Sequence, residues 1–279
     1  DNRPVEDGAN VITTIDAGLQ RIAHEQLDSM LCRQQASFGV AMVMEVQTGN
    51  ILCMVSLGSG RERGTQYTEL VNNHALKTAI SPGSTMKLAT AMALLEIGGY
   101  TLETLVDTEH SKPGKKVKVG NAKIEDSHDV AAEKSDSRVT LLDAFAHSSN
   151  VYFAKAIYEN YNNDRDGYVK FLRERLHLGE DIGFKNMEEK LPYIPDPENK
   201  KQWSAHTLPN MGYGYAIELP PIRMATLYNA VANGGKMVAP RLVKELRRGE
   251  KVVESYPVRV MDEQICSPEA LKIVQECLE

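Results

Sequence analysis

Ser84 and Lys87 stand three residues apart in the stretch SPGSTMKLAT, where an apolar helical pattern begins. A serine hydroxyl is a weak nucleophile at neutral pH and needs a base to take its proton. Lysine can be that base when burial or a nearby charge lowers its pKa. Because residues i and i+3 share one helix face, the spacing predicts a hydroxyl and an amine within reach. The helix start would also favour a developing oxyanion, although chance S-x-x-K pairs are common.

A second polar cluster lies in the stretch AHSSNVYF, where Ser148 and Asn150 flank Ser149. The Ser148 hydroxyl could relay a proton between the lysine and a leaving group, and the Asn150 amide could bind a substrate carbonyl. The alternative is a helix cap, since Ser and Asn favour caps. We interpret His147 as a packing or hydrogen-bonding residue, because Lys87 already fills the role of the base.

Other patterns carry less chemistry. The stretch EDSHD contains Asp126, His128 and Asp129, but its spacing matches no common metal site, so we predict no metal. The glycines of Gly212-Tyr213-Gly214 lack the Lys-Ser/Thr pair of a phosphate loop, so a turn near the cleft is the better interpretation. We expect Trp203 and Tyr213 to pack rather than bind substrate, and no organic cofactor is indicated.

Composition limits the classes of partner. The 279 residues carry a formal net charge of −6 with a pI near 5.7, which argues against a nucleic-acid partner. Hydrophobic residues make up 42% and charged residues 25%, as in a globular protein with a real core. No stretch reaches about 18 consecutive apolar residues, and the four cysteines form no C-x-x-C pair.

The order of periodic segments predicts an α+β fold. We expect one antiparallel sheet that collects strands from residues 1–60 and 231–279, and a mostly helical lobe over residues 80–230. Within that order we predict a helix capped by Thr14 or Asp16, a hairpin that turns at Gly49, a helix over residues 84–98, a helical segment broken at residues 147–150, a helix that stops at Gly234-Gly235, and a last helix over residues 267–278.

S-x-x-K followed by S-x-N resembles the motif series of penicillin-binding proteins and class A β-lactamases. The chain is similar to the transpeptidase domain of class B penicillin-binding proteins, and SSN in place of S-D-N favours them over the lactamases. Further stretches match, including VITTIDAGLQRIAHEQL, GVAMVMEVQTGNILCMVS and GYGYAIELPPIRMATLYNAVANGGKMVAP. The resemblance implies the penicillin-binding protein/β-lactamase-like serine transferase fold over residues 1–279.

The resemblance also implies a function. Ser84 would be acylated by a peptidoglycan stem peptide, Lys87 would activate it, Ser148 would relay the proton and Asn150 would bind substrate. β-Lactam antibiotics would acylate the same serine. The implied setting is the outer face of the bacterial cytoplasmic membrane, with an N-terminal membrane anchor in the full-length protein, division or elongation proteins as partners, and no metal or cofactor.

Two departures from the family pattern stand out. Pro220 and Arg223 occupy ELPPIRMA where threonine and glutamine are expected, so that this segment could pack differently. No K-T-G occurs, and we expect the natural protein to continue to that motif beyond Glu279, leaving this chain weakly active or inactive. The alternatives are a β-lactamase or β-lactam-sensing domain of the same fold, or a non-catalytic binding module that lacks K-T-G.

Overall fold

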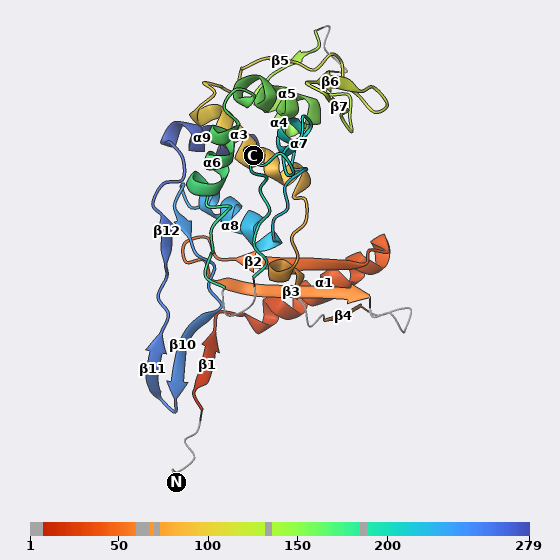
Figure 1. Ribbon diagram of the computed structural model, residues 1–279. Coiled ribbons are helices and arrows are strands. Elements are labelled where there is room, and N and C mark those ends of the chain that lie inside the picture. The colour runs from red at the N-terminus through yellow and green to blue at the C-terminus, as the bar shows by residue number, and fades with distance from the viewer. Residues whose placement is uncertain (1–7, 60–66, 70–72, 132–135, 185–188) are drawn as a thin grey trace.

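The computed structural model describes residues 8–59, 67–69, 73–131, 136–184 and 189–279. Helices gather at one end of the molecule, a hairpin sheet crosses its middle, and a narrow three-stranded sheet extends from the other end (Figure 1). The helices are α1 Ala17–Gln34, α2 His74–Lys77, α3 Lys87–Glu96, α4 Leu141–Ala146, α5 Asn150–Tyr161, α6 Arg165–Lys170, α7 Thr207–Met211, α8 Pro221–Ala232 and α9 Pro268–Leu278. A 3₁₀ turn, η1 Gly83–Met86, precedes α3, and a π-helical turn, η2 Phe171–Arg175, follows α6.

Strands from the two ends of the chain pair with each other. The strands are β1 Asn10–Thr13, β2 Phe38–Met44, β3 Ile51–Ser59, β4 Tyr67–Glu69, β5 Val106–Asp107, β6 Val117–Val119, β7 Ala122–Ile124, β8 Arg138–Val139, β9 Met237–Val238, β10 Val243–Arg248, β11 Lys251–Ser255 and β12 Val260–Asp262. One antiparallel sheet has the order β1-β10-β11, and a second has the order β2-β3-β4. Pairs β9–β12, β5–β8 and β6–β7 complete the strands.

The expectation of a single sheet is therefore wrong, because the strands form separate sheets. Strands from both ends of the chain do pair, since β1 pairs with β10. The two three-stranded sheets meet at Thr14, directly after β1. Its hydroxyl donates to the carbonyl oxygens of Ile51 and Arg241 at 2.7 and 2.9 Å. The single hydroxyl proton is thus shared between a carbonyl of β3 and one on the segment just before β10.

The β2–β3 hairpin confirms the predicted turn at Gly49, which has φ 71°. A Cβ at this glycine would collide with the carbonyl oxygen of Ala239, so the turn is held closely against the segment after β9. Asp16 caps α1 by accepting from the Leu19 amide at 2.9 Å. Of the two predicted caps, Asp16 therefore fills the position, while Thr14 joins the sheets.

Helix α3 forms the centre of the main hydrophobic core. Its residues Lys87 to Leu94 are all buried, because KLATAMALLE is apolar around the helix apart from Lys87, Thr90 and the final Glu96. Helices α5, α8 and α9 surround it (Figure 1), and Tyr161 donates its hydroxyl to the Ala93 carbonyl at 2.8 Å. Pro221 begins α8, and Ser267 caps α9, which is the predicted C-terminal helix.

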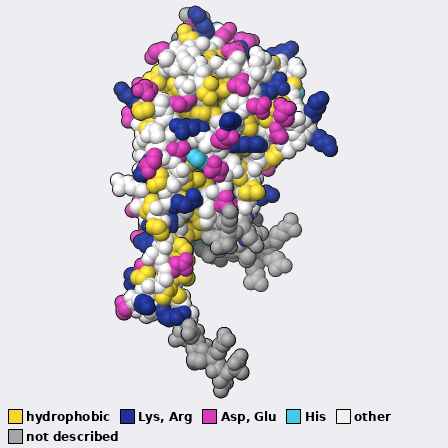
Figure 2. All heavy atoms as spheres, turned by 60° about the vertical axis from the view of Figure 1, so that its left-hand side comes forward, with side chains coloured by type: hydrophobic (Ala, Val, Ile, Leu, Met, Phe, Trp, Pro, Cys, Tyr) yellow, Lys and Arg dark blue, Asp and Glu magenta, His cyan; other side chains and the backbone are white. Residues whose placement is uncertain are grey.

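The sheet β1-β10-β11, which we call the β-arm, projects away from this core (Figure 1). Every residue of β11 is exposed, and hydrophobic side chains lie among charged ones on the narrow projection seen in Figure 2. Over the described parts of the chain, no helix combines the length and apolar character needed to cross a bilayer. The four cysteines are all unpaired.

Candidate active site

Ser84 lies in the 3₁₀ turn η1 that leads directly into α3. The predicted helix over residues 84–98 is therefore shorter, since the α-helical turns run from Lys87 to Glu96. In a 3₁₀ turn the side chains at i and i+3 eclipse one another. This geometry brings Ser84 and Lys87 onto one face more directly than an α-helical turn would.

The structure brings all four predicted site residues together. Lys87 Nζ lies 3.1 Å from Ser84 Oγ, 2.9 Å from Ser148 Oγ and 2.8 Å from Asn150 Oδ1. It also donates to the Ser148 carbonyl oxygen at 2.6 Å, and the Ser148 hydroxyl donates to Ser84 Oγ at 3.0 Å. We call Ser84, Lys87, Ser148 and Asn150 the serine–lysine cluster.

Lys87 is buried to 98% although Ser84 is exposed. Burial lowers the pKa of the Lys87 amine to about 8, and the Asp126 carboxylate partly opposes that effect. The ring of Phe153 lies beneath the amine, with its centroid 5.9 Å from Nζ. An amine with this pKa is roughly one tenth neutral near pH 7, whereas a solvated lysine is almost wholly charged.

Ser148 and Asn150 reach the amine from the turn between α4 and α5. The predicted break at residues 147–150 is confirmed: α4 ends at Ala146 and α5 begins at Asn150. Ser148 takes a left-handed conformation with φ 54°, which costs a non-glycine residue about 1–2 kcal/mol. Ser149 caps α5 by accepting from the Tyr152 amide at 3.0 Å, so the capping alternative is true of Ser149.

Two residues outside the predicted catalytic set shape this cluster. Asp126, which the sequence offers only as a metal ligand, is buried and accepts hydrogen bonds from Ser149 Oγ and the Val151 amide, both at 3.0 Å. Gly214 belongs to the segment that the sequence predicts as a turn near the cleft. Its carbonyl oxygen accepts from the Gly83 amide at 3.0 Å, directly beside the nucleophile turn. Gly214 has φ 89°, and a Cβ there would collide with the backbone of Gly83.

The remaining sequence candidates lie elsewhere or act in packing. His147 is exposed at the end of α4, and His128 and Asp129 are exposed on the loop after β7. Trp203 packs against the main core, and Tyr213 packs against the cluster formed by β6, β7 and α5. Among the residues that the structure describes, no three His, Cys, Asp or Glu side chains form a potential metal site.

Arg223, which with Pro220 makes up the first departure from the family pattern, is fully buried on α8 and forms an ion pair with Glu189. Burial lowers the pKa of the Arg223 guanidinium and raises that of the Glu189 carboxyl, and each partner opposes the shift of the other. Pro220 precedes α8 in an extended conformation, which suits the residue before Pro221. Neither residue belongs to the serine–lysine cluster.

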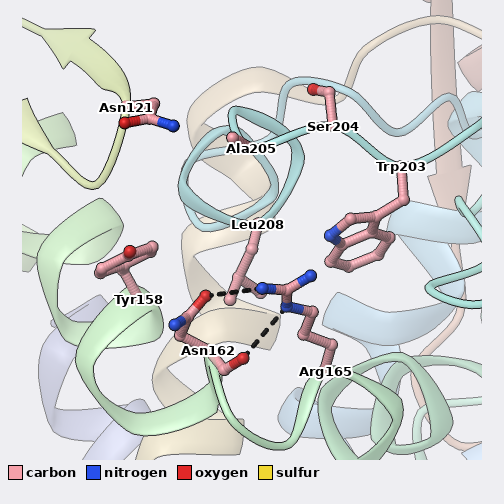
Figure 3. A pocket seen from close by; sticks show the side chains of 8 residues that line it. All are labelled: Asn121, Tyr158, Asn162, Arg165, Trp203, Ser204, Ala205 and Leu208. Atoms are coloured by element: carbon pink, nitrogen blue, oxygen red, sulfur yellow. Dashed lines mark hydrogen bonds between the residues drawn. The ribbon is translucent and has the colours of Figure 1, made fainter. Parts of the chain in front are cut away.

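A separate small pocket of about 190 Å³ opens between the β6–β7 turn, α5, α6 and α7 (Figure 3). Asn121, Trp203 and Arg165 lie around it, and the Arg165 guanidinium donates to the Asn162 carbonyl and side-chain oxygens at 3.0 and 3.1 Å. Arg165, the cation among the lining residues, is thus hydrogen-bonded to Asn162 at the end of α5. None of its lining residues belongs to the serine–lysine cluster, so the chemistry and this pocket are distinct.

Comparisons with known proteins agree with the geometry. The chain is 28% identical over 231 residues to peptidoglycan D,D-transpeptidase FtsI of Buchnera aphidicola subsp. Schizaphis graminum, covering 81% of this chain and 37% of that protein. It is 25% identical over 240 residues to penicillin-binding protein PbpB of Mycobacterium tuberculosis, covering 85% and 33%. The chain thus spans about a third of the length of these two relatives.

Solved structures show the same fold. Penicillin-binding protein 3 of Mycobacterium tuberculosis, complexed with aztreonam, matches with a TM-score of 0.77 and 23% identity, covering 97% of this chain and 57% of that one. Penicillin-binding protein 2B of Streptococcus pneumoniae matches with a TM-score of 0.78 and 18% identity, covering 98% and 46%. These likenesses confirm the predicted penicillin-binding protein fold.

The family model described as the penicillin binding protein transpeptidase domain matches residues 39–279, which is most of the chain. The resemblance found in the sequence is therefore confirmed, and the chain belongs to the penicillin-binding protein transpeptidase family, on the class B side.

Proposed function

We propose that this chain carries the acyl-transfer site of a peptidoglycan D,D-transpeptidase. The observation that supports it most strongly is the position of Lys87 Nζ, within 3.1 Å of both the Ser84 and the Ser148 hydroxyl oxygens. A nucleophile and its base must lie within hydrogen-bond reach of each other. The names of the relatives, peptidoglycan D,D-transpeptidase and penicillin-binding protein, support the reaction class.

The hydrogen bonds around Lys87 favour its role as a base. The Ser148 carbonyl oxygen and Asn150 Oδ1 can only accept, so they take both N–H groups of a neutral amine. The Asn150 amide nitrogen donates to the Glu125 carbonyl at 3.1 Å, which holds Oδ1 toward the lysine. The lone pair of the neutral amine is therefore left for the Ser84 hydroxyl proton, while the Ser148 hydroxyl donates to Ser84 Oγ.

In the proposed reaction, Ser84 Oγ attacks the carbonyl carbon between two D-alanines of a stem peptide while Lys87 takes the hydroxyl proton. The C–N bond breaks, and the proton held by Lys87 passes through the Ser148 hydroxyl to the amine nitrogen of the departing D-alanine, which leaves Lys87 neutral again. The product is an ester between Ser84 and the stem peptide. An amine of a neighbouring stem then attacks this ester, forms the cross-linking amide and regenerates the Ser84 hydroxyl.

The same chemistry accounts for the other proposals. A β-lactam would be opened by Ser84 at its ring amide and remain as an ester, and one structural neighbour is complexed with the β-lactam aztreonam. We propose that residues 1–279 act within one transpeptidase domain. The full-length protein would act outside the cytoplasmic membrane, held by an N-terminal anchor and together with division or elongation proteins.

The test is covalent labelling by a fluorescent penicillin, with the adduct located by peptide mass spectrometry. No Lys-Thr-Gly triplet occurs in the 279 residues, so the measurement belongs on the full-length protein, and we expect the chain alone to label weakly or not at all. We expect the adduct on Ser84, with complete loss of labelling in Ser84→Ala.

Thr85→Ala is the matched control, because Thr85 is the neighbouring hydroxyl and donates only to the Pro82 carbonyl, at 2.8 Å. It should label like the parent. An adduct on another residue, or no adduct in the full-length parent, would contradict the proposal. Rapid release of the label would instead identify a β-lactamase.

A further inference from the structure

Asp126 is a buried carboxylate that faces the turn carrying Ser148 and Asn150. It is only 1% exposed and lies in the loop after β7. Its Oδ2 accepts from Ser149 Oγ and its Oδ1 accepts from the Val151 amide, each at 3.0 Å. Its own amide donates to Ser111 Oγ at 3.1 Å, which fixes the carboxylate to the segment after β5.

These contacts hold the turn at the point where it is strained. Ser148 has a left-handed backbone, and such conformations persist only where surrounding contacts over-determine them. Asp126 binds the two residues on either side of Asn150, and Asn150 itself is held by the Glu125 carbonyl. The loop after β7 therefore sets the direction in which Ser148 and Asn150 face Lys87.

We propose that Asp126 is a positioning residue of the serine–lysine cluster: its carboxylate clamps the Ser149–Val151 turn, and its negative charge acts on the Lys87 amine from behind that turn. This inference rests on the proposed acyl-transfer function for its catalytic consequence. The hydrogen bonds of the clamp and the charge of Asp126 belong to the folded chain and do not depend on that function.

Other charged groups near α3 are exposed or engaged elsewhere. On α5, Lys155 pairs with Glu109 at 2.6 Å. At the end of α3, Glu96 accepts from the Ser267 amide of α9 at 2.8 Å. On η2, Arg175 lies 3.6 Å from Asp262.

On the loop of Asp126 itself, the side chains of Glu125, His128 and Asp129 are exposed. Among the described residues, Asp126 is the charged group that acts on the Lys87 amine.

The two effects have opposite consequences for catalysis. The clamp keeps the proton relay in place, so loosening it should slow acylation, because small misplacements of reacting groups cost large factors in rate. The negative charge favours the protonated amine. It therefore opposes the effect of burial, and without it the pKa of Lys87 would lie below about 8. Removing the charge should therefore let Lys87 lose its proton at a lower pH.

The first experiment follows the ¹³Cε resonance of Lys87 in lysine-labelled protein against pH, assigned by its loss in Lys87→Met. We expect a midpoint near pH 8 in the parent and a lower midpoint in Asp126→Asn. Asp129→Asn removes the same charge from the same loop at an exposed position and should leave the midpoint unchanged. An unchanged midpoint in Asp126→Asn overturns the electrostatic half of the proposal.

The second experiment measures the rate of acylation of the full-length protein by fluorescent penicillin against pH. Asp126→Asn should acylate at least about tenfold more slowly at its plateau, and the rise of its rate with pH should move to lower pH. Ser149→Ala keeps the charge but removes one contact of the clamp, together with the cap of α5. It should lose rate without moving that rise.

The outcomes distinguish failure of the clamp from failure of the proposed function. Parent-like rates in both Asp126→Asn and Ser149→Ala overturn the clamp. If Asp126→Asn does not fold, Ser149→Ala still tests the clamp, because a parent-like rate in that variant contradicts it. A parent that never acylates sinks the proposed function instead, while the ¹³C titration continues to test the charge on Lys87.

Discussion

The serine–lysine cluster and the β-arm are built in opposite ways. The cluster stands on α3, whose residues from Lys87 to Leu94 are all buried, and on a turn clamped by a buried carboxylate. In the β-arm, every residue of β11 is exposed, and Val252 and Val253 are 41% and 46% exposed. Backbone pairing rather than a core holds the arm.

The difference shows where a chain can hold strained groups. In the helical region, a left-handed Ser148 and the close approach of Gly214 to Gly83 are fixed by neighbours on several sides. A buried lysine needs such surroundings, since its desolvation must be offset by hydrogen bonds. The β-arm has few surrounding contacts, so its residues should tolerate substitution.

The first contrast compares two glycines with positive φ. Gly214→Ala would push a methyl group into the Gly83 backbone and should lower the free energy of unfolding by about 3 kcal/mol. Gly249→Ala, at the β10–β11 turn, has φ 59° but no atom within 4 Å of the added Cβ, so only about 1 kcal/mol should be lost. Thermal unfolding followed by circular dichroism measures both, and equal losses would remove the contrast.

The next contrast compares apolar side chains. Met92→Ala opens a cavity in the centre of the main core and should lower the free energy of unfolding by about 3 kcal/mol. Val253→Ala, on the exposed strand β11, should change it by about 0.5 kcal/mol or less. Urea unfolding gives both values. A large loss in Val253→Ala would mean that the β-arm contributes a core of its own.

The smallest contrast concerns two serines. Ser148→Ala and Ser148→Gly both remove the hydroxyl, but glycine relieves the left-handed strain, so the Gly variant should be the more stable by about 1 kcal/mol. At Ser255 at the end of β11, where φ is not positive, alanine should be the more stable by about 0.5 kcal/mol. If thermal unfolding shows the alanine variant to be the more stable at both positions, strain at Ser148 does not affect stability.

Much of the site was predictable because its determinants are local. The spacing of Ser84 and Lys87, the break between α4 and α5, and the start of α9 after Ser267 depend on residues within one helical turn. The α+β class also followed from the order of periodic segments. The helix over residues 84–98 was predicted too long, since propensity does not distinguish a 3₁₀ turn from the first α-helical turn.

Taken by itself, the sequence determined which side chains could react and which turn presents them, because helix periodicity and capping act over three or four residues. Only the tertiary structure decided that Asp126 clamps the Ser149–Val151 turn, that Gly214 lies against Gly83, and that β2-β3-β4 and β1-β10-β11 form separate sheets. Each of these depends on segments far apart in the chain meeting in the folded protein. Whether a helix cap, a carboxylate or a missing Cβ contributes to the site depends on whether it is buried, and burial cannot be predicted from a local sequence pattern.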